Sequence, residues 1–125
     1  MAEQAKQVLV VDDDEPCRVL AKRILSRNGY SVDMACDGFE GLEIASTKQY
    51  DLILMDVMMP DMDGFEVCKK IKDVSANVDT PIIMVSALDS INDMAKANEA
   101  GAMWYVSKPY DMKYLVSVVN HRVTS

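Results

Sequence analysis

The chain has 125 residues, half of them hydrophobic, which fits one folded domain with a buried core and argues against disorder. Its formal net charge of −7 argues against direct binding to nucleic acid, because phosphate backbones are bound by clusters of Lys and Arg. The sequence contains no apolar run long enough to cross a membrane and no signal-peptide core. The three cysteines are widely spaced without a CxxC pair, which indicates reduced thiols in a cytoplasmic protein.

The first predicted unit is a strand followed by a helix. Residues 8–11 form a continuous apolar run, which is typical of a strand buried on both faces. Three acids follow, and Glu15 and Pro16 suit the first turn of a helix. The apolar face of this helix continues to Leu25, and Asn28 with Gly29 is expected to end it.

Four further strand–helix units are predicted along the chain. Residues 31–35 alternate in polarity, as in an edge strand. Asp37 with Glu40 resembles a capping box for a helix reaching about residue 48, with Phe39, Leu42 and Ala45 on its apolar face. The third strand is expected at 52–55, followed by a helix capped at Asp63. The fourth strand is expected at 82–85, followed by a weakly amphipathic helix over 90–101. The fifth strand is expected at 103–106, followed by a last helix around 115–122.

Five βα units with short loops predict an α/β fold, because right-handed crossovers build a parallel, doubly wound sheet from them. We expect the flavodoxin-like strand order 2-1-3-4-5 with five flanking helices. Residues 1–125 are expected to form a single domain, with its core at about 8–122 and without an effector domain.

Polar side chains follow four of the predicted strands. Asp12 and Asp13 follow the first strand, Asp56 the third, Ser86 the fourth and Lys108 the fifth. The carboxyl ends of parallel strands share one edge of the sheet, and the first and third strands are neighbours in the expected order. Three carboxylates would therefore converge, and such a cluster needs a proton or a cation. Oxygen ligands without His or Cys favour Mg²⁺.

Ser86 and Lys108 supply a hydroxyl donor and a positive charge, which are the groups that bind a phosphoryl group. The residues therefore predict phosphoryl transfer onto a carboxylate, with Asp56 as the nucleophile. Asp12 and Asp13 would hold the metal, while Ser86 and Lys108 would contact the remaining phosphoryl oxygens.

Simpler interpretations stay open for several residues. Asp14 is expected to cap the first helix. Ser86 has an alternative role as a cap of the fourth helix, although Ser90 suits that role better. Tyr105, judged on the residues alone, fits the core, and His121 fits a solvated helix end.

Four motifs at the predicted strand ends resemble those of the receiver domain of two-component response regulators. The resemblance covers about Val8 to Arg122. The motifs are Val10-Val11-Asp12-Asp13-Asp14, Leu54-Met55-Asp56-Val57-Met58-Met59-Pro60 with Gly64, Val85-Ser86-Ala87, and Tyr105-Val106-Ser107-Lys108-Pro109.

The resemblance implies a phosphoacceptor and a metal site. Asp56 would accept the phosphoryl group, Asp13 would be the main metal-binding acid and Asp12 would assist. The backbone carbonyl of Met58 would be a further ligand. The implied ion is Mg²⁺, with Mn²⁺ or Ca²⁺ as substitutes.

The resemblance also implies a switch. Lys108, Ser86 and the backbone of Ala87 would contact phosphate. Ser86 and Tyr105 would form the switch pair, and the bond before Pro109 would be cis.

The implied phosphodonor is a histidine kinase or a histidine phosphotransfer protein. A downstream protein would bind through the fourth helix, fifth strand and fifth helix, and the chain would be a monomer or a weak phosphorylation-dependent dimer. Such a protein is not an enzyme, although it assists its own phosphorylation and dephosphorylation. A receiver cut from a larger regulator fits equally well. The alternative function is a Mg²⁺-dependent phosphatase enzyme of similar fold, which would turn over many substrate molecules.

Two apolar residues are expected to affect the lifetime of the phosphate. Met58 and Leu88 lie two residues past Asp56 and Ser86. Receivers that lose phosphate quickly often carry polar groups at these places to orient water. The sequence therefore predicts slow loss of phosphate.

Overall fold

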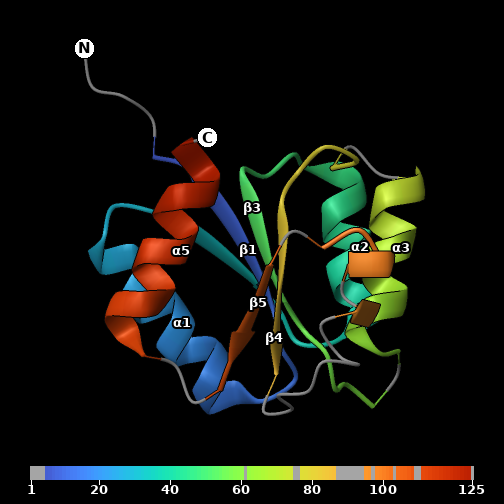
Figure 1. The fold of residues 1–125 in the computed structure, drawn as a ribbon, viewed down its shortest axis with the longest axis horizontal. Helices are drawn as coiled ribbons and strands as arrows, with labels where there is room; N and C mark the ends of the chain where they lie inside the picture. The colour runs from blue at the N-terminus through green and yellow to red at the C-terminus, as the bar shows by residue number, and fades with distance from the viewer. Residues whose placement is uncertain are drawn as a thin grey trace.

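The fold is a five-stranded parallel sheet with helices on both faces (Figure 1). It was obtained as a computed structural model that describes residues 5–60, 62–74, 77–86, 95–96, 98–102, 104–108 and 111–124. The strand order is β2-β1-β3-β4-β5, with all neighbours parallel, which confirms the predicted topology. The strands are β1 (Gln7–Val11), β2 (Ser31–Ala35), β3 (Leu52–Asp56), β4 (Ile82–Ser86) and β5 (Trp104–Ser107).

Among the described residues, two complete helices cover each face of the sheet. Figure 1 shows α1 and α5 on one face and α2 and α3 on the other. β3 and β4 are buried along their whole length, because helices cover both of their faces. The helices are α1 (Glu15–Arg27), α2 (Gly38–Thr47), α3 (Gly64–Val74) and α5 (Met112–Thr124).

The described residues contain four complete helices rather than the five predicted. The predicted fourth helix, from Ser90 to Gly101, lies largely outside the described residues. Its described positions 95–96 and 98–99 have helical backbone, and Gly101 after them has a positive φ of 96°. Among the helices described here, none has the length and apolar character required to span a membrane.

Aspartates cap four of the described helices, three of them as the sequence predicts and α5 through Asp111, which accepts from Tyr114 at 3.0 Å. Each accepts a hydrogen bond from the backbone N–H three residues later, which satisfies a donor that the helix leaves unpaired. The other pairs are Asp14 with Cys17 at 3.2 Å, Asp37 with Glu40 at 2.8 Å and Asp63 with Glu66 at 2.9 Å. At the other end of α1, Gly29 follows the cap residue Asn28 and has a φ of 91°.

The predicted apolar face of α2 is partly wrong. Phe39 is 62% exposed, whereas Gly38, Gly41 and Ala45 are buried. A Cβ on Gly41 would lie 2.9 Å from the side-chain methyl carbons of Val11, so the backbone of α2 packs directly on β1. This close approach turns the small residues toward the sheet and Phe39 toward solvent.

A buried amide fixes the start of β3. Asn77 is fully buried, and its side-chain oxygen accepts the backbone N–H of Tyr50 at 2.7 Å. Its amide nitrogen donates to the carbonyl oxygens of Ala45 at 2.6 Å and Lys48 at 2.8 Å. Thr80 donates its hydroxyl to Asn77 at 2.9 Å. This network joins the end of α2 and the loop before β4 to the residues that lead into β3.

Candidate functional site

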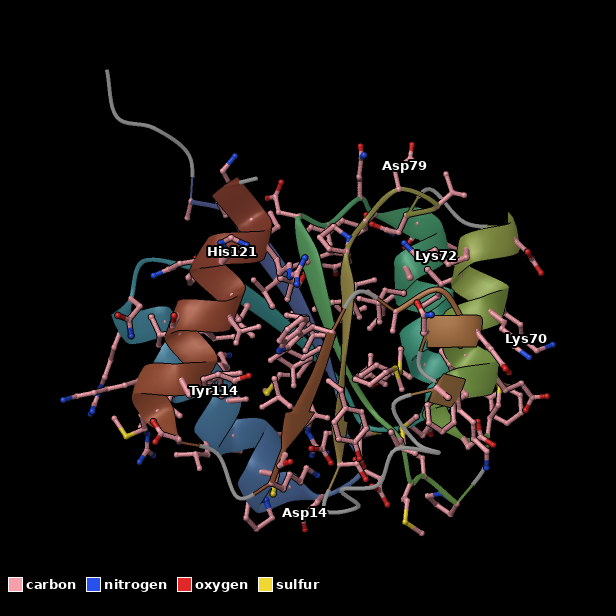
Figure 2. All side chains as sticks on the ribbon, in the orientation of Figure 1. Asp14, Lys70, Lys72, Asp79, Tyr114 and His121 are labelled. Carbon is pink, nitrogen blue, oxygen red and sulfur yellow. The ribbon has the colours of Figure 1, made fainter. Side chains whose placement is uncertain are left out.

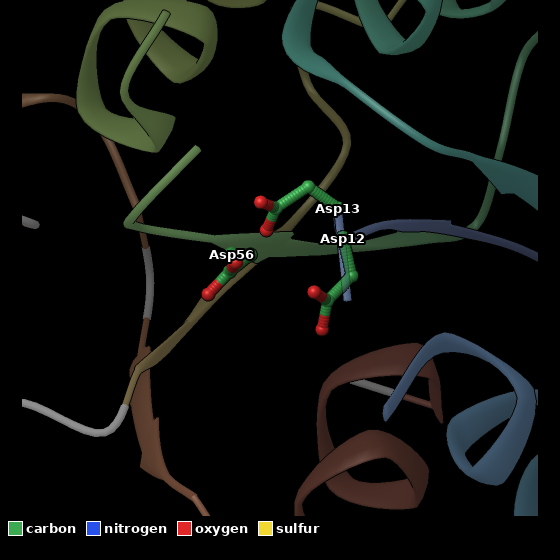
Figure 3. Close-up of side chains that lie close together, drawn as sticks. All are labelled: Asp12, Asp13 and Asp56. Atoms are coloured by element: carbon green, nitrogen blue, oxygen red, sulfur yellow. The ribbon is translucent and has the colours of Figure 1, made fainter. Parts of the chain in front are cut away.

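Three carboxylates converge at the carboxyl edge of the sheet (Figure 3). Asp12 and Asp13 directly follow β1, and Asp56 is the last residue of β3. One oxygen from each carboxylate lies within 4.8 Å of the other two. The side chains meet because β1 and β3 are neighbours and end at the same level, with Val11 opposite Met55. Asp12 is 1% exposed and Asp56 5%, whereas Asp13 is exposed.

The backbone around Asp12 is held on several sides. Its N–H donates to the carbonyl oxygen of Ala35 at 3.1 Å, and its own carbonyl oxygen accepts from Arg18 Nη1 at 2.7 Å. The side-chain oxygen Oδ1 accepts the N–H of Asp14 at 2.9 Å. These contacts leave Oδ2 of Asp12 directed at the cluster.

Lys108 is the cation that faces these acids. Its Nζ lies 2.9 Å from Asp12 Oδ2 and 3.4 Å from Asp56 Oδ1, and its side chain is 14% exposed. The backbone N–H of Lys108 donates to the carbonyl oxygen of Ser86 at 2.8 Å, which ties the residue to the end of β4. Burial lowers the pKa of Lys108, but its contacts with Asp12 and Asp56 raise that pKa above its ordinary value.

One lysine leaves the cluster with an excess of negative charge. Burial, and then the charge of Asp12, raise the pKa of Asp56 to about 7, although Lys108 acts in the opposite direction. Without a further cation, part of the Asp56 carboxyl is therefore protonated at neutral pH.

The residues present suit a small divalent cation. The side-chain ligands gathered here are all carboxylate oxygens, which hard ions such as Mg²⁺ prefer. Asp12 Oδ2 is buried, and its close partner among the described residues is the Lys108 ammonium at 2.9 Å. A carboxylate oxygen has a second lone pair, so Oδ2 can ligate a metal beside this contact.

Two further predicted site residues lie on neighbouring strands. Ser86 ends β4 and is 1% exposed, and its strand neighbour Val85 pairs with Asp56. Tyr105 lies on β5 opposite Met84 and is partly buried against the core on the α2–α3 face of the sheet.

Three other predictions concern the loops around the site. Met58 follows β3, and its side chain is 62% exposed. Ala87 and Pro109 lie outside the described residues, so the backbone phosphate contact and the cis bond stay predictions.

His121, on α5, lies at the opposite end of the molecule from Asp14 and the acidic cluster (Figure 2).

Sequence reasoning missed Arg18. Its guanidinium reaches the backbone beside the cluster from the first half of α1. A basic residue near the N-terminus of a helix is unfavourable to the helix dipole, and this could have indicated a role for it.

Comparison with known proteins identifies the family. The response regulator receiver domain profile matches residues 8–120. The chain belongs to the response regulator receiver domain family. This receiver domain is 40% identical over 111 residues to the response regulator MprA of Mycobacterium sp. (strain KMS), an alignment that covers 89% of this chain and 47% of MprA. The chain thus spans about half the length of the curated relatives it matches.

Solved receiver structures have the same fold. A CheY-like response regulator receiver domain protein from Methanospirillum hungatei JF-1 superposes with a TM-score of 0.90 at 30% identity, covering 96% of this chain and 94% of the other. A response regulator from Burkholderia pseudomallei superposes with a TM-score of 0.84 at 25% identity, covering 95% of this chain and 69% of the other. That structure is described as containing a phosphorylated aspartic acid, a calcium ion and citrate.

Proposed function

We propose that this receiver domain accepts a phosphoryl group on Asp56 in a Mg²⁺-dependent reaction. The donor is the phosphohistidine of a histidine kinase or of a histidine phosphotransfer protein. The observation that carries the proposal is the convergence of three carboxylates within 4.8 Å, with Lys108 3.4 Å from Asp56. The phosphorylated aspartic acid and calcium ion of the Burkholderia pseudomallei relative support it.

The acids divide into a nucleophile and metal ligands. Asp56 is the nucleophile, because it ends the central strand β3 and occupies the phosphoacceptor position of the receiver motif. Asp13 and Asp12 hold Mg²⁺ together with Asp56 and the backbone carbonyl of Met58, and Mn²⁺ or Ca²⁺ can replace it. When bound, the ion neutralises negative charge on the carboxylates and on the phosphoryl oxygens.

The chemical step needs the ionised form of Asp56. Its carboxylate oxygen attacks phosphorus, the bond between phosphorus and the histidine nitrogen breaks, and the leaving imidazole takes up a proton from solvent. Positive charge from Lys108 favours the ionised nucleophile and stabilises charge on the phosphoryl group. Ser86 donates its hydroxyl to a phosphoryl oxygen, and the backbone N–H of Ala87 does the same.

Phosphorylation acts as a switch through Ser86 and Tyr105. The Ser86 hydroxyl moves toward the new phosphoryl group, and the Tyr105 ring turns inward. The face formed by the fourth helix, β5 and α5 then changes its affinity for a downstream protein. The domain itself binds no nucleic acid, acts in the cytoplasm, and is a monomer or a weak phosphorylation-dependent dimer.

The proposal describes a stoichiometric phosphoacceptor rather than an enzyme that acts on external substrates. Mass spectrometry after incubation with acetyl phosphate and Mg²⁺ tests it. We expect one acid-labile phosphoryl group per chain, absent in Asp56→Asn and absent when EDTA replaces Mg²⁺. Phosphate uptake by Asp56→Asn equal to that of the wild type would place the acceptor elsewhere. Continuous release of phosphate from a phosphomonoester, without a labelled chain, would favour the phosphatase alternative.

A further inference from the structure

We propose that Arg18 is a positioning residue that holds Asp12 and Asp13 in the arrangement that binds the metal. This inference rests on the proposed function, because it concerns the affinity of the same acidic cluster for Mg²⁺. The contact that motivates it is a single hydrogen bond of 2.7 Å from Arg18 Nη1 to the carbonyl oxygen of Asp12.

The position of that carbonyl matters. It belongs to the peptide bond that joins Asp12 to Asp13, so its direction fixes the orientation of that peptide plane. The same plane leads into the backbone of Asp13, the exposed acid of the cluster. By holding the carbonyl, Arg18 constrains where the Asp13 carboxylate can point.

The remaining contacts of Asp12 act through its N–H and its side chain and do not touch its carbonyl oxygen. The Asp12 N–H donates to the carbonyl oxygen of Ala35, and Asp12 Oδ1 accepts the backbone N–H of Asp14. Among the contacts described for this loop, the one from Arg18 is the contact on the carbonyl side of Asp12. Without it, the Asp12–Asp13 peptide plane would keep only the indirect restraint of the bond from the Asp14 N–H to Asp12 Oδ1, which spans it.

The surroundings of Arg18 favour a specific role over a helix-stabilising one. Arg18 lies in the first half of α1, where positive charge opposes the helix dipole. Its ion pair with Glu15 is long, at 3.9 Å, and the Glu15 side chain is 80% exposed, so this pair contributes little. The Arg18 side chain is itself only 14% exposed. A cation buried at this place costs desolvation that the Glu15 pair does not offset.

Positioning and charge make opposite predictions for metal affinity. If Arg18 positions the acids, its removal loosens the ligands and weakens Mg²⁺ binding. If only its charge mattered, its removal would relieve repulsion between two cations and would strengthen Mg²⁺ binding. The direction of the change therefore identifies the role.

Isothermal titration calorimetry with Mg²⁺ alone measures this change without phosphorylation. We expect Arg18→Ala to raise the dissociation constant for Mg²⁺ about tenfold, as for loss of one hydrogen bond to a charged donor. Arg18→Gln keeps an N–H donor without the charge, and we expect a smaller loss of affinity. Arg23→Ala is the matched control, since it removes the same charge from an exposed position of α1 and should change the dissociation constant less than about twofold.

Thermal unfolding of each metal-free variant separates this role from general stability. A variant that is less stable but binds Mg²⁺ like the wild type would overturn the inference, as would tighter binding by Arg18→Ala or Arg18→Gln. If Arg18→Ala does not fold, the decision passes to Arg18→Gln. If the wild type is phosphorylated on Asp56 and binds Mg²⁺ while the Arg18 variants behave identically, the role of Arg18 fails and the proposed function stands. If the wild type binds no Mg²⁺, both fail.

Discussion

Gly64 at the start of α3 packs against the main chain of Asp56. A Cβ on Gly64 would lie 2.1 Å from the carbonyl oxygen of Asp56 and 2.8 Å from the terminal methyl of Met84. The N–H of Gly64 also donates to the carbonyl oxygen of Val57 at 2.8 Å. The glycine therefore lets the first turn of α3 sit directly against the end of β3, where the candidate phosphoacceptor lies.

We expect Gly64→Ala to destabilise the fold by about 2–3 kcal/mol, because the new methyl group meets backbone that cannot move aside easily. Urea unfolding followed by circular dichroism measures this change. Gly29→Ala is the control: that site has open space but a φ of 91°, so the expected cost is about 1 kcal/mol. Equal effects of the two changes would contradict the role of close packing at Gly64.

Asp56→Asn should stabilise the metal-free protein at pH 8. Burial and the Asp12 charge raise the pKa of Asp56 to about 7 in the folded chain, from an ordinary value of 3.8. Between these pH values the folded chain holds a proton that the unfolded chain has released, so stability falls as pH rises. We expect a gain of about 1–2 kcal/mol for Asp56→Asn above pH 7.

The pH dependence of the gain in stability tests whether relief of the Asp56 charge causes it. Urea unfolding in EDTA at several pH values should show the difference growing from about pH 4 to pH 7 and then levelling. Asp13→Asn removes the same charge from the exposed member of the cluster and should give a smaller gain. A constant difference across pH would show that relief of charge is not the cause.

Ionised Asp33 stabilises the folded protein, whereas ionised Asp56 destabilises it. Its Oδ2 accepts hydrogen bonds from Lys48 Nζ and from the Tyr50 hydroxyl, each at 2.7 Å. The hydrogen bond from Lys48 has the largest effect, and together with that from Tyr50 it holds the pKa of Asp33 below its ordinary value of 3.8. The stabilisation of the folded state by ionised Asp33 is therefore complete above about pH 4 and is lost as pH falls through the lowered pKa.

We expect Asp33→Asn to lower stability at pH 7 by about 0.5–1 kcal/mol, a small value because the carboxylate is partly exposed and screened by water. Chemical unfolding at pH 7 and at pH 3 should show the difference shrinking at the lower pH. Asp73→Asn, at an exposed position of α3, changes the same charge and should have little effect at either pH. A difference that persists undiminished at acid pH would contradict this account.

Met58 is predicted to lengthen the lifetime of the aspartyl-phosphate. Its exposed side chain lines an open hollow of about 520 Å³ beside the cluster, together with Asp13, Phe65 and Lys96. We expect Met58→Asn to accelerate phosphate loss about tenfold, since an amide can orient an attacking water where a thioether cannot. The decay of phosphoprotein after removal of the donor, followed by mass spectrometry, measures this rate. Met58→Leu should leave it near the wild-type value.

The main features of the fold follow from patterns that the sequence carries locally. The apolar runs ending at Val11 and Met55 predict central strands, and the strand order then brings Asp12 and Asp56 together. Convergence of the site could be predicted because it depends on strand ends, which topology places on one edge.

The parts that could not be predicted depend on contacts between distant segments. Phe39 looks like a core residue, but the close approach of Gly41 to Val11 sets a different buried face for α2. Asn77 looks like a loop residue, yet it is fully buried because three segments supply its hydrogen-bond partners. Arg18 was missed because its partner is a backbone carbonyl, which no side-chain pattern reveals.

Trp104 is the single tryptophan of the chain, and β5 presents it to solvent with 45% of its surface exposed. Its indole N–H donates to the hydroxyl of Tyr114 at 3.1 Å, and the Arg122 guanidinium lies 4.9 Å from the ring centre. Both partners belong to α5, so any displacement of that helix along the strand changes the polarity around the indole. Trp104 is thus an intrinsic fluorophore at the contact between β5 and α5, and its emission can be followed in real time without a chemical label.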